Sequence, residues 1–299
     1  ENSSILTTLD LISRQTILPK EVIFVNSSST DESFKTIDKW IDKNHKNLST
    51  KYRNIDEGTD TPSSSKNIGI INAKTEWIAF MDCGLIFPLD WLEKQWNYIL
   101  TKKYDVVSGV VVLEGSNLLD NAAVCQTYGF KRKRPCVPST IVKKSIFDKT
   151  GLFLKDRRAG YDAEWPLTLN ALNIYRAINF EMIVKYDGIN IGNSFKSIFQ
   201  KSIIYTIPTI GLKHYKLSYC YILLLAFYLL SLFLSIRFSI ILLFIYILFR
   251  GFIIPIIKSR NVKGFFINPI MIILIPIIGI LIDFGKTIGS LIGIKKYHF

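Results

Sequence analysis

The sequence predicts an α/β domain with a mostly parallel sheet over about residues 1–190, followed by a membrane-associated C-terminal part. Short β-branched apolar runs at 21–25 (EVIFV) and 77–81 (WIAFM) predict buried strands. They alternate with segments of helical spacing, which is typical of sheets covered by helices. The composition then changes, because residues 218–236 contain no charge.

The elements of the N-terminal domain follow from periodicity, from Pro19 and from the polar turn at 27–31. The expected helices are 5–17, 32–43, 65–73 and 91–100, and the expected strands are 21–25, 77–81 and 105–113. In open α/β sheets, ligands bind beyond the carboxyl ends of the strands. Polar residues occupy two of these ends, at Asn26 to Ser28 and at Asp82.

The C-terminal part predicts membrane helices. A membrane domain is expected over 217–299, with spans at about 218–236, 238–257 and 266–282, because such runs approach the bilayer core of about 30 Å. Residues 191–216 alternate bulky apolar residues with Lys and predict an interfacial amphipathic segment. Three apolar runs in close succession would leave a soluble domain without a polar face, which disfavours buried core helices.

The charge distribution favours a membrane partner over nucleic acid. The net charge is +13, but residues 201–299 alone contain eleven Lys or Arg and one acid, Asp283. These basic residues flank apolar runs, as at a membrane surface. The loop 258–263 has three positive charges and the 236–238 turn has Arg237. The positive-inside rule therefore predicts a multi-pass protein of the inner (cytoplasmic) membrane, with its N-terminal domain in the cytoplasm.

The four cysteines show no paired spacing, so neither a disulfide framework nor a zinc site is indicated. The sequence opens without a signal-peptide pattern. Both observations predict a reduced N-terminal domain.

Several motifs in the first 185 residues carry a family resemblance. They are EVIFVNSSSTD at 21–31, KNIG at 66–69, WIAFMDCG at 77–84, PLDWL at 88–92, VPSTIVKK at 137–144 and AGYDAEW at 159–165. In this order they resemble family-2 glycosyltransferases with the GT-A fold, of the type found in bacterial surface-polysaccharide synthesis.

The resemblance implies a UDP- or GDP-sugar donor and assigns the site. It implies nucleotide-sugar binding by Glu21, Asn26, Ser28, Asp31, Lys66, Asn67 and Asp82, and an acceptor side with Tyr161, Glu164 and Trp165. Sugar transfer must neutralise a departing diphosphate, commonly with Mg²⁺ or Mn²⁺ held by a carboxylate, here Asp82. It must also deprotonate the acceptor hydroxyl, and Asp162 is the candidate base. An acid after a strand is also common as a turn residue or helix cap.

Four features depart from the family pattern. Asn26 replaces an Asp, Gly84 replaces the last acid of the DxD motif, and Tyr161 replaces the Glu of an E-D pair. The usual first strand with its Y-N motif is missing before Glu1, so an N-terminally truncated chain is expected. The Gly84 replacement puts the metal site in question.

The predicted function is a membrane-anchored glycosyltransferase that moves a sugar to a lipid-linked glycan or polysaccharide acceptor, and the resemblance implies inversion. A catalytically impaired scaffold subunit and a polyprenyl-phosphate glycosyltransferase are the alternatives. A processive synthase is disfavoured, because it needs more spans and a Q-x-x-R-W motif. A transporter is disfavoured because Arg250 is the one charge inside the second run.

Overall fold

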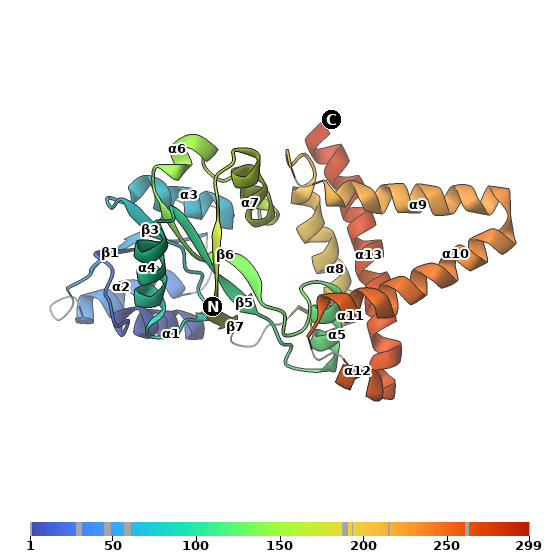
Figure 1. Ribbon diagram of the computed structural model, residues 1–299, viewed down its shortest axis with the longest axis horizontal. Coiled ribbons are helices and arrows are strands. Elements are labelled where there is room, and N and C mark those ends of the chain that lie inside the picture. The colour runs from blue at the N-terminus through green and yellow to red at the C-terminus, as the bar shows by residue number, and fades with distance from the viewer. Residues whose placement is uncertain are drawn as a thin grey trace. The chain divides into compact units, whose positions relative to one another are not determined.

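The computed structural model describes residues 2–27, 32–44, 49–56, 61–186, 191–192, 194–214, 216–260 and 263–298. The chain divides into two compact units (Figure 1). The first unit comprises Glu1–Val111 and Lys133–Asp187, and the second comprises Val112–Arg132 and Gly188–Phe299. The sequence did not predict that residues 112–132 join the C-terminal part of the chain.

The first unit contains the elements expected from periodicity and several more. Its helices are α1 Asn2–Ser13, α2 Ser33–Asn44, α3 Pro62–Asn72, α4 Trp91–Lys102, α6 Ile146–Thr150 and α7 Tyr161–Ala171. Its strands are β1 Glu21–Val25, β2 Lys51–Ile55, β3 Trp77–Ala79, β4 Leu85–Ile86, β5 Val106–Val112, β6 Arg134–Lys143 and β7 Ala177–Tyr186. The four predicted helices and three predicted strands are confirmed to within a few residues.

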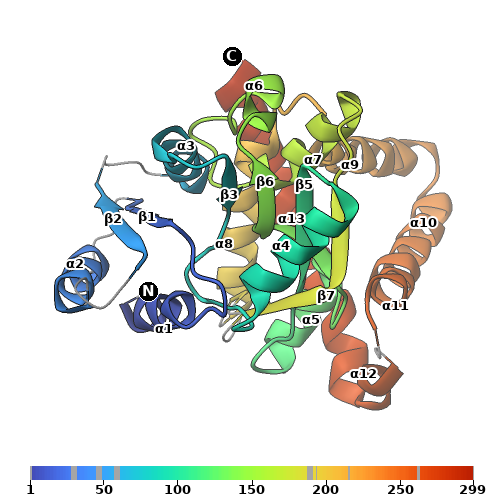
Figure 2. The same cartoon turned by 60° about the vertical axis from the view of Figure 1, so that its left-hand side comes forward.

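The sheet is mixed rather than mostly parallel. Five strands lie in the order β3-β6-β5-β7-β4, and β6 pairs antiparallel with both β3 and β5 (Figure 2). Strands β1 and β2 form a separate parallel pair. We expected a parallel sheet because strands and helices alternate in the early part of the domain, and this pattern does not continue in the later strands. The helix after β5 belongs to the second unit, and β6 pairs antiparallel with β5 where the chain returns to the first unit.

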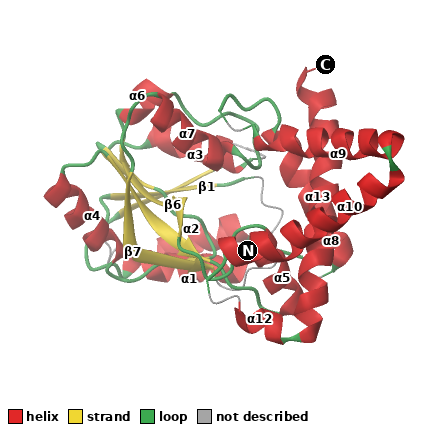
Figure 3. Cartoon of the chain, turned by 45° about the vertical axis from the view of Figure 1, so that its right-hand side comes forward, coloured by secondary structure: helices red, strands yellow, loops and turns green. Residues whose placement is uncertain are grey.

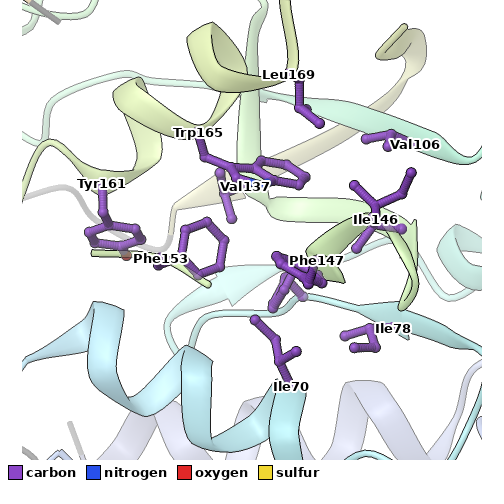
Figure 4. Packing of buried hydrophobic residues seen from close by; sticks show 12 residues of the cluster. Ile70, Ile78, Val106, Val137, Ile146, Phe147, Phe153, Tyr161, Trp165 and Leu169 are labelled. Carbon is purple, nitrogen blue, oxygen red and sulfur yellow. The ribbon is translucent and has the colours of Figure 1, made fainter. Parts of the chain in front are cut away.

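Helices flank the five-stranded sheet (Figure 3), and one apolar cluster joins them to it (Figure 4). The α/β class is thereby confirmed. The cluster is formed by Ile70, Ile78, Phe80, Val106, Val137, Val142, Ile146, Phe147, Phe153, Tyr161, Trp165 and Leu169. Its members come from α3, α6, α7, three strands and the segments between them, so burial of these side chains fixes α3 and α7 against the sheet.

Gln15 joins two segments that the sequence analysis considered separately. Its amide Nε2 donates to the Pro88 carbonyl at 2.9 Å, and its Oε1 accepts from the Leu92 backbone N–H at 3.0 Å. The end of α1 therefore satisfies a backbone donor in the first turn of α4, a group that has no partner within the helix.

The second unit is helical throughout the residues that the structure describes. Its elements are α5 Leu118–Gln126, α8 Phe195–Thr206, a 3₁₀ turn Ile207–Thr209, α9 Leu217–Leu234, α10 Ile236–Leu248, a π-helical turn Phe249–Ile253, α11 Ile254–Lys258, α12 Lys263–Ile267 and α13 Pro269–His298. Three stretches are long and apolar enough to cross a membrane, namely Leu217–Leu234, Ile236–Lys258 and Pro269–Tyr297. The prediction of three apolar C-terminal helices is confirmed.

Glycines of α13 allow α8 to pack unusually close. A Cβ on Gly289 would lie 2.6 Å from the Ile203 carbonyl oxygen, and one on Gly293 would lie 2.7 Å from the Ile207 oxygen. A Cβ on Gly285 would lie 2.8 Å from the Ser202 Cβ and 3.0 Å from the Phe199 carbonyl oxygen. The spacing of four residues places the three glycines along one side of α13. Small residues in this pattern let two helix backbones approach each other.

We predict that Gly289→Ala destabilises the second unit by about 1–3 kcal/mol, because the added methyl group overlaps backbone atoms of α8 that have no room to move. Thermal unfolding of the purified protein in detergent measures the effect. Gly264→Ala in α12 is the control, since an added Cβ there meets nothing within 4 Å. Equal unfolding midpoints for the two variants would contradict the close packing.

Candidate functional site

Three segments distant in sequence bring charged and polar side chains together. Lys66 lies on α3, Asp82 lies in the turn after β3, and Tyr161 begins α7. The Lys66 Nζ lies 2.6 Å from Asp82 Oδ1 and 5.6 Å from the centroid of the Tyr161 ring. The Lys66 side chain is 12% exposed and that of Asp82 is 32% exposed. The pair therefore lies at the edge of solvent, where a ligand can reach it.

Burial and charge act in opposite directions on Lys66. Burial disfavours the ammonium, but the Asp82 carboxylate outweighs it and holds the pKa of Lys66 above its usual range. Burial also raises the pKa of Tyr161 to about 12, although the nearby Lys66 opposes this rise. Near neutral pH the site therefore presents a fixed ammonium beside a neutral phenol.

Asp162 follows Tyr161 in the first turn of α7 and lies at the surface of the domain. Desolvation by the surrounding protein raises the pKa of its carboxyl, Lys66 lowers it and Asp82 raises it. The neighbour of Asp162 in the chain, Tyr161, is the residue whose ring lies 5.6 Å from the Lys66 Nζ. A carboxylate with a raised pKa is a stronger base, which is the property that deprotonation of a hydroxyl requires.

A second polar group gathers where the parallel strands β1 and β2 end. The Asn26 Nδ2 donates to Asp56 Oδ1 at 3.1 Å, and the Ser27 and Ser65 hydroxyls lie 2.6 Å apart. Ser65 immediately precedes Lys66 on α3, so this strand end adjoins the Lys66–Asp82 pair. Sequence reasoning missed Asp56. Its signal is that it follows β2 as Asn26 follows β1, but the strand KYRNI was not among the expected strands.

Glu21 lies at the other end of β1, about 16 Å along the strand from Asn26. Its carboxylate forms an ion pair with Arg53, at 2.7 Å from Nε, and Arg53 also donates to the Asn72 carbonyl. The structure thus does not bring Glu21 together with the other predicted residues. Ser28 and Asp31 lie outside the described residues.

Asn67 and two serines of α3 hold the segment that leads to α7. The Asn67 amide donates to the Phe153 carbonyl at 2.8 Å and accepts from the Phe153 N–H at 2.9 Å. The Ser64 and Ser63 hydroxyls accept from the backbone N–H groups of Asp156 and Arg157. Asn67 is buried, so its observed role is to position this segment and, through it, Asp162.

The remaining residues assigned to the acceptor side lie in the interior. Trp165 is buried, stacks on Phe147 with centroids 5.7 Å apart, and donates from Nε1 to the Thr150 hydroxyl. Glu164 is also buried. Of the predicted acceptor-side residues, Tyr161 is the one whose contact with Lys66 joins it to the charged group.

The side chains fit a divalent cation only together with a substrate. Among the described residues, no group of three or more His, Cys, Asp or Glu could hold a metal ion. Asp82 Oδ1 pairs with Lys66, whose positive charge opposes a second cation at this oxygen. Gly84 has φ +84°, which L side chains rarely adopt, so an acid at this position would be strained. Mg²⁺ is often bound through one or two carboxylates plus substrate phosphates and water, and this arrangement suits Asp82.

This fold and this polar edge define an α/β domain of the GT-A type. Residues 1–143 match the family model described as "Glycosyl transferase family 2". The chain is also similar to an uncharacterized glycosyltransferase of Haemophilus influenzae, with 34% identity over 80 residues, which are 27% of this chain and 30% of the relative.

Comparison with solved structures gives a match with a TM-score above 0.5. The chain resembles the mannosyltransferase PcManGT from Pyrobaculum calidifontis in complex with GDP-Man and Mn²⁺, with a TM-score of 0.52 and 15% identity. This match covers 70% of our chain and 59% of that protein. A second match is TarS 1-349 of S. aureus in complex with UDP-GlcNAc, with a TM-score of 0.46, 16% identity, and coverage of 70% and 63%. The chain spans less than two thirds of the length of each of these proteins.

We predict that Asn67→Ala destabilises the first unit by about 2–4 kcal/mol, because it leaves the buried N–H and C=O of Phe153 without partners. Thermal unfolding in detergent measures the loss. Asn97→Ala, on the exposed side of α4, is the control, for which we expect a change within about 0.5 kcal/mol. If Asn67→Ala and the control had the same unfolding midpoint, the two hydrogen bonds would add nothing to stability.

Proposed function

We propose that this protein is a membrane-anchored glycosyltransferase that moves a sugar from a UDP- or GDP-sugar to a lipid-linked glycan or polysaccharide acceptor. The observation that carries the proposal is the Lys66–Asp82 ion pair beside the Tyr161 ring, with Asp162 next to Tyr161, at one edge of a domain that matches the family-2 glycosyltransferase model. The proposal names the chemical class of the donor nucleotide, of the sugar and of the acceptor.

The chemistry assigns one task to each charged group. The Lys66 ammonium faces the diphosphate of the donor and offsets the negative charge that develops as it leaves. Asp162 takes the proton from the acceptor hydroxyl. The hydroxyl oxygen forms a bond to the anomeric carbon while the bond from that carbon to the diphosphate oxygen breaks. This single displacement from the opposite face inverts the configuration.

Asp82 would hold Mg²⁺ or Mn²⁺ together with the donor diphosphate, and the ion would supply further positive charge to the leaving group. In the protein without donor, Asp82 orients Lys66. Asn26, Ser27 and Ser65, at the adjoining strand end, suit the nucleoside part of the donor because they offer neutral hydrogen-bonding groups.

The apolar C-terminal helices support membrane anchoring, and anchoring supports a lipid-linked acceptor because enzyme and acceptor then share one surface. The positive charges that follow the second apolar stretch support a catalytic domain on the cytoplasmic side of the inner membrane. Within this proposal, the catalytic domain predicted over 1–190 comprises 1–111 and 133–187, and the membrane domain predicted over 217–299 also includes 112–132.

A scaffold subunit that binds a nucleotide-sugar without transferring it is the second candidate. It is favoured by Gly84, which supplies no carboxylate beside Asp82 and has a backbone conformation that disfavours one. The measurements below separate binding from turnover and so distinguish the two candidates.

Asp162→Asn is expected to lower the rate of sugar transfer by about 10²–10⁴-fold, because the amide cannot accept the proton of the acceptor. Donor affinity should change little. Transfer from radiolabelled donors into the lipid fraction measures the rate, and calorimetric titration measures donor binding. Asp148→Asn, an exposed acid on α6, is the matched control. If both variants transfer at the wild-type rate, Asp162 is not the base.

The pH profile of kcat/KM tests the electrostatics of Asp162. The base acts when deprotonated, so activity falls as the pH drops through its pKa. Because that pKa is raised, the acid limb should lie above the value of about 3.9 for an ordinary aspartate. Lys66→Met removes a charge that lowers the Asp162 pKa, so the limb should move to still higher pH in the activity that remains. A limb that moves down would refute this assignment.

Asp82→Asn tests the proposed metal position. Mn²⁺ should tighten donor binding to the wild type, and this gain should disappear in the variant because an amide is a weak ligand for the ion. Asp90→Asn, at the start of α4, controls for the loss of one negative charge. A gain from Mn²⁺ that persists in Asp82→Asn would place the metal elsewhere.

A further inference from the structure

The three apolar helices of the second unit differ in how much of their surface the protein covers. In an apolar 18-residue portion of each stretch, the structure buries 11% of the residues for α9, 17% for the stretch that contains α10 and α11, and 44% for α13. Along α9 and α10 the exposed residues include Phe227, Leu230, Phe233, Ile240 and Phe244. These two helices are therefore apolar around their circumference and nearly uncovered.

Helices α9 and α10 leave α13 and meet each other in a turn away from it (Figures 1 and 3). The polar contacts between α9 and α13 lie in the first turns of α9. Ser290 Oγ donates to the Ser218 carbonyl at 2.9 Å, and Lys286 Nζ donates to the Tyr221 hydroxyl at 3.0 Å. Near the tip, the Ser231 and Ser239 hydroxyls join α9 to α10 at 2.9 Å. From Tyr221 to the end of α9, the hairpin extends about 20 Å.

The chain returns from the hairpin to α13 at a charged junction. Arg250, on the π-helical turn, binds Asp283 of α13 with Nε–Oδ2 at 2.6 Å and Nη2–Oδ1 at 2.9 Å. The Tyr246 hydroxyl donates to the same carboxylate at 3.0 Å. Gln126 of α5 contacts Arg250 and donates to the Ile275 carbonyl at 2.8 Å. Arg250, Asp283 and Lys286 thus all lie at the base of the hairpin.

The positions of these charged residues indicate where α13 lies relative to the bilayer. Asp283 and Lys286 lie near the middle of its 30 residues. If α13 crossed the bilayer, both charges would lie in the hydrocarbon centre, where ionised groups are costly. At the membrane surface the same charges would lie at headgroup level. Tyr221 and Tyr246, which contact them, would then occupy the interface, where tyrosine is enriched.

The two sides of α13 suit a surface position. One side is packed through Gly285, Gly289 and Gly293 against α8. The exposed side carries apolar residues three, four or seven positions apart, a stripe that fits the boundary between headgroups and acyl chains. The stripe consists of Ile270, Ile273, Ile277, Ile280, Phe284 and Leu291.

We infer that α9 and α10 enter the membrane as a hairpin, whereas α13 lies along the membrane surface, packed on α8, and does not cross. The inference rests on the membrane association proposed above and specifies its form. Both ends of the hairpin lie on one side, so the end of α13 lies on the same side of the membrane as the first unit. Three crossings would put it on the opposite side.

Depth-dependent fluorescence quenching tests the inference in the full chain reconstituted in phospholipid vesicles. The exposed cysteines Cys83 and Cys220 are replaced by Ser, and a fluorophore is attached at Phe227→Cys or Phe284→Cys. These positions are matched, since both are Phe, 55% and 57% exposed, near the middle of α9 and α13. Lipids spin-labelled deep in the acyl chain should quench 227 most, and headgroup-labelled lipids should quench 284 most.

Equal deep quenching at both positions would overturn the inference, because α13 would then span the bilayer. Deep quenching at 284 with none at 227 would also overturn it. Absence of quenching at both positions would instead refute the membrane association, so the two failures are distinguishable.

Sidedness provides a second readout that does not depend on the fluorophore. A membrane-impermeant maleimide applied to sealed vesicles of one orientation should modify Lys296→Cys from the same face as Lys102→Cys, an exposed position on α4. Modification of the two variants from opposite faces would contradict the inference.

Discussion

The hydrogen bonds made by helix α3 are the constraint on which the candidate site depends. The six residues Pro62 to Asn67 start the helix, and the last five bind something outside it. Ser63, Ser64 and Asn67 hold the backbone of the segment 153–157, and Ser65 meets the end of β1. Lys66 extends to Asp82. One short helix thus fixes the distance between a strand end, an acid and the segment that carries Asp162.

The second unit is held together by different forces. Apolar helices in lipid gain little from hydrophobic burial against one another, so close packing and polar contacts must hold them. The glycines of α13 supply the close packing with α8. The Arg250–Asp283 pair, with Tyr246 and Gln126, supplies a polar junction among α5, α10 and α13. Removal of one charge from such a junction would leave the other without compensation, which is more costly than loss of both.

The sequence predicted much of the first unit, because its early strands and helices have clear periodicity and each helix buries one face. It did not predict strand direction after residue 105. The antiparallel pairing of β5 and β6 depends on which unit the segment between them joins, and periodicity does not show this. Lys66, Asp82, Tyr161 and Asp162 were predicted from motifs, and the structure adds that Lys66 pairs with Asp82 and lies beside the Tyr161 ring. Asn67 and Trp165 were predicted from the same motifs, yet their side chains point into the interior. Neighbouring helical residues differ by about 100° in direction, so a motif does not reveal which of them faces a ligand.

The most direct test of the central claim is donor binding and turnover by the full chain in lipid nanodiscs, measured with a panel of UDP- and GDP-sugars and extracted membrane lipids as acceptor. The account predicts that at least one donor binds and that its sugar enters the lipid fraction. It also predicts that Lys66→Met weakens donor binding while Lys149→Met, at an exposed position on α6, binds the donor as the wild type does. Failure of every donor to bind the wild-type chain would contradict the assignment of this edge of the sheet as a nucleotide-sugar site.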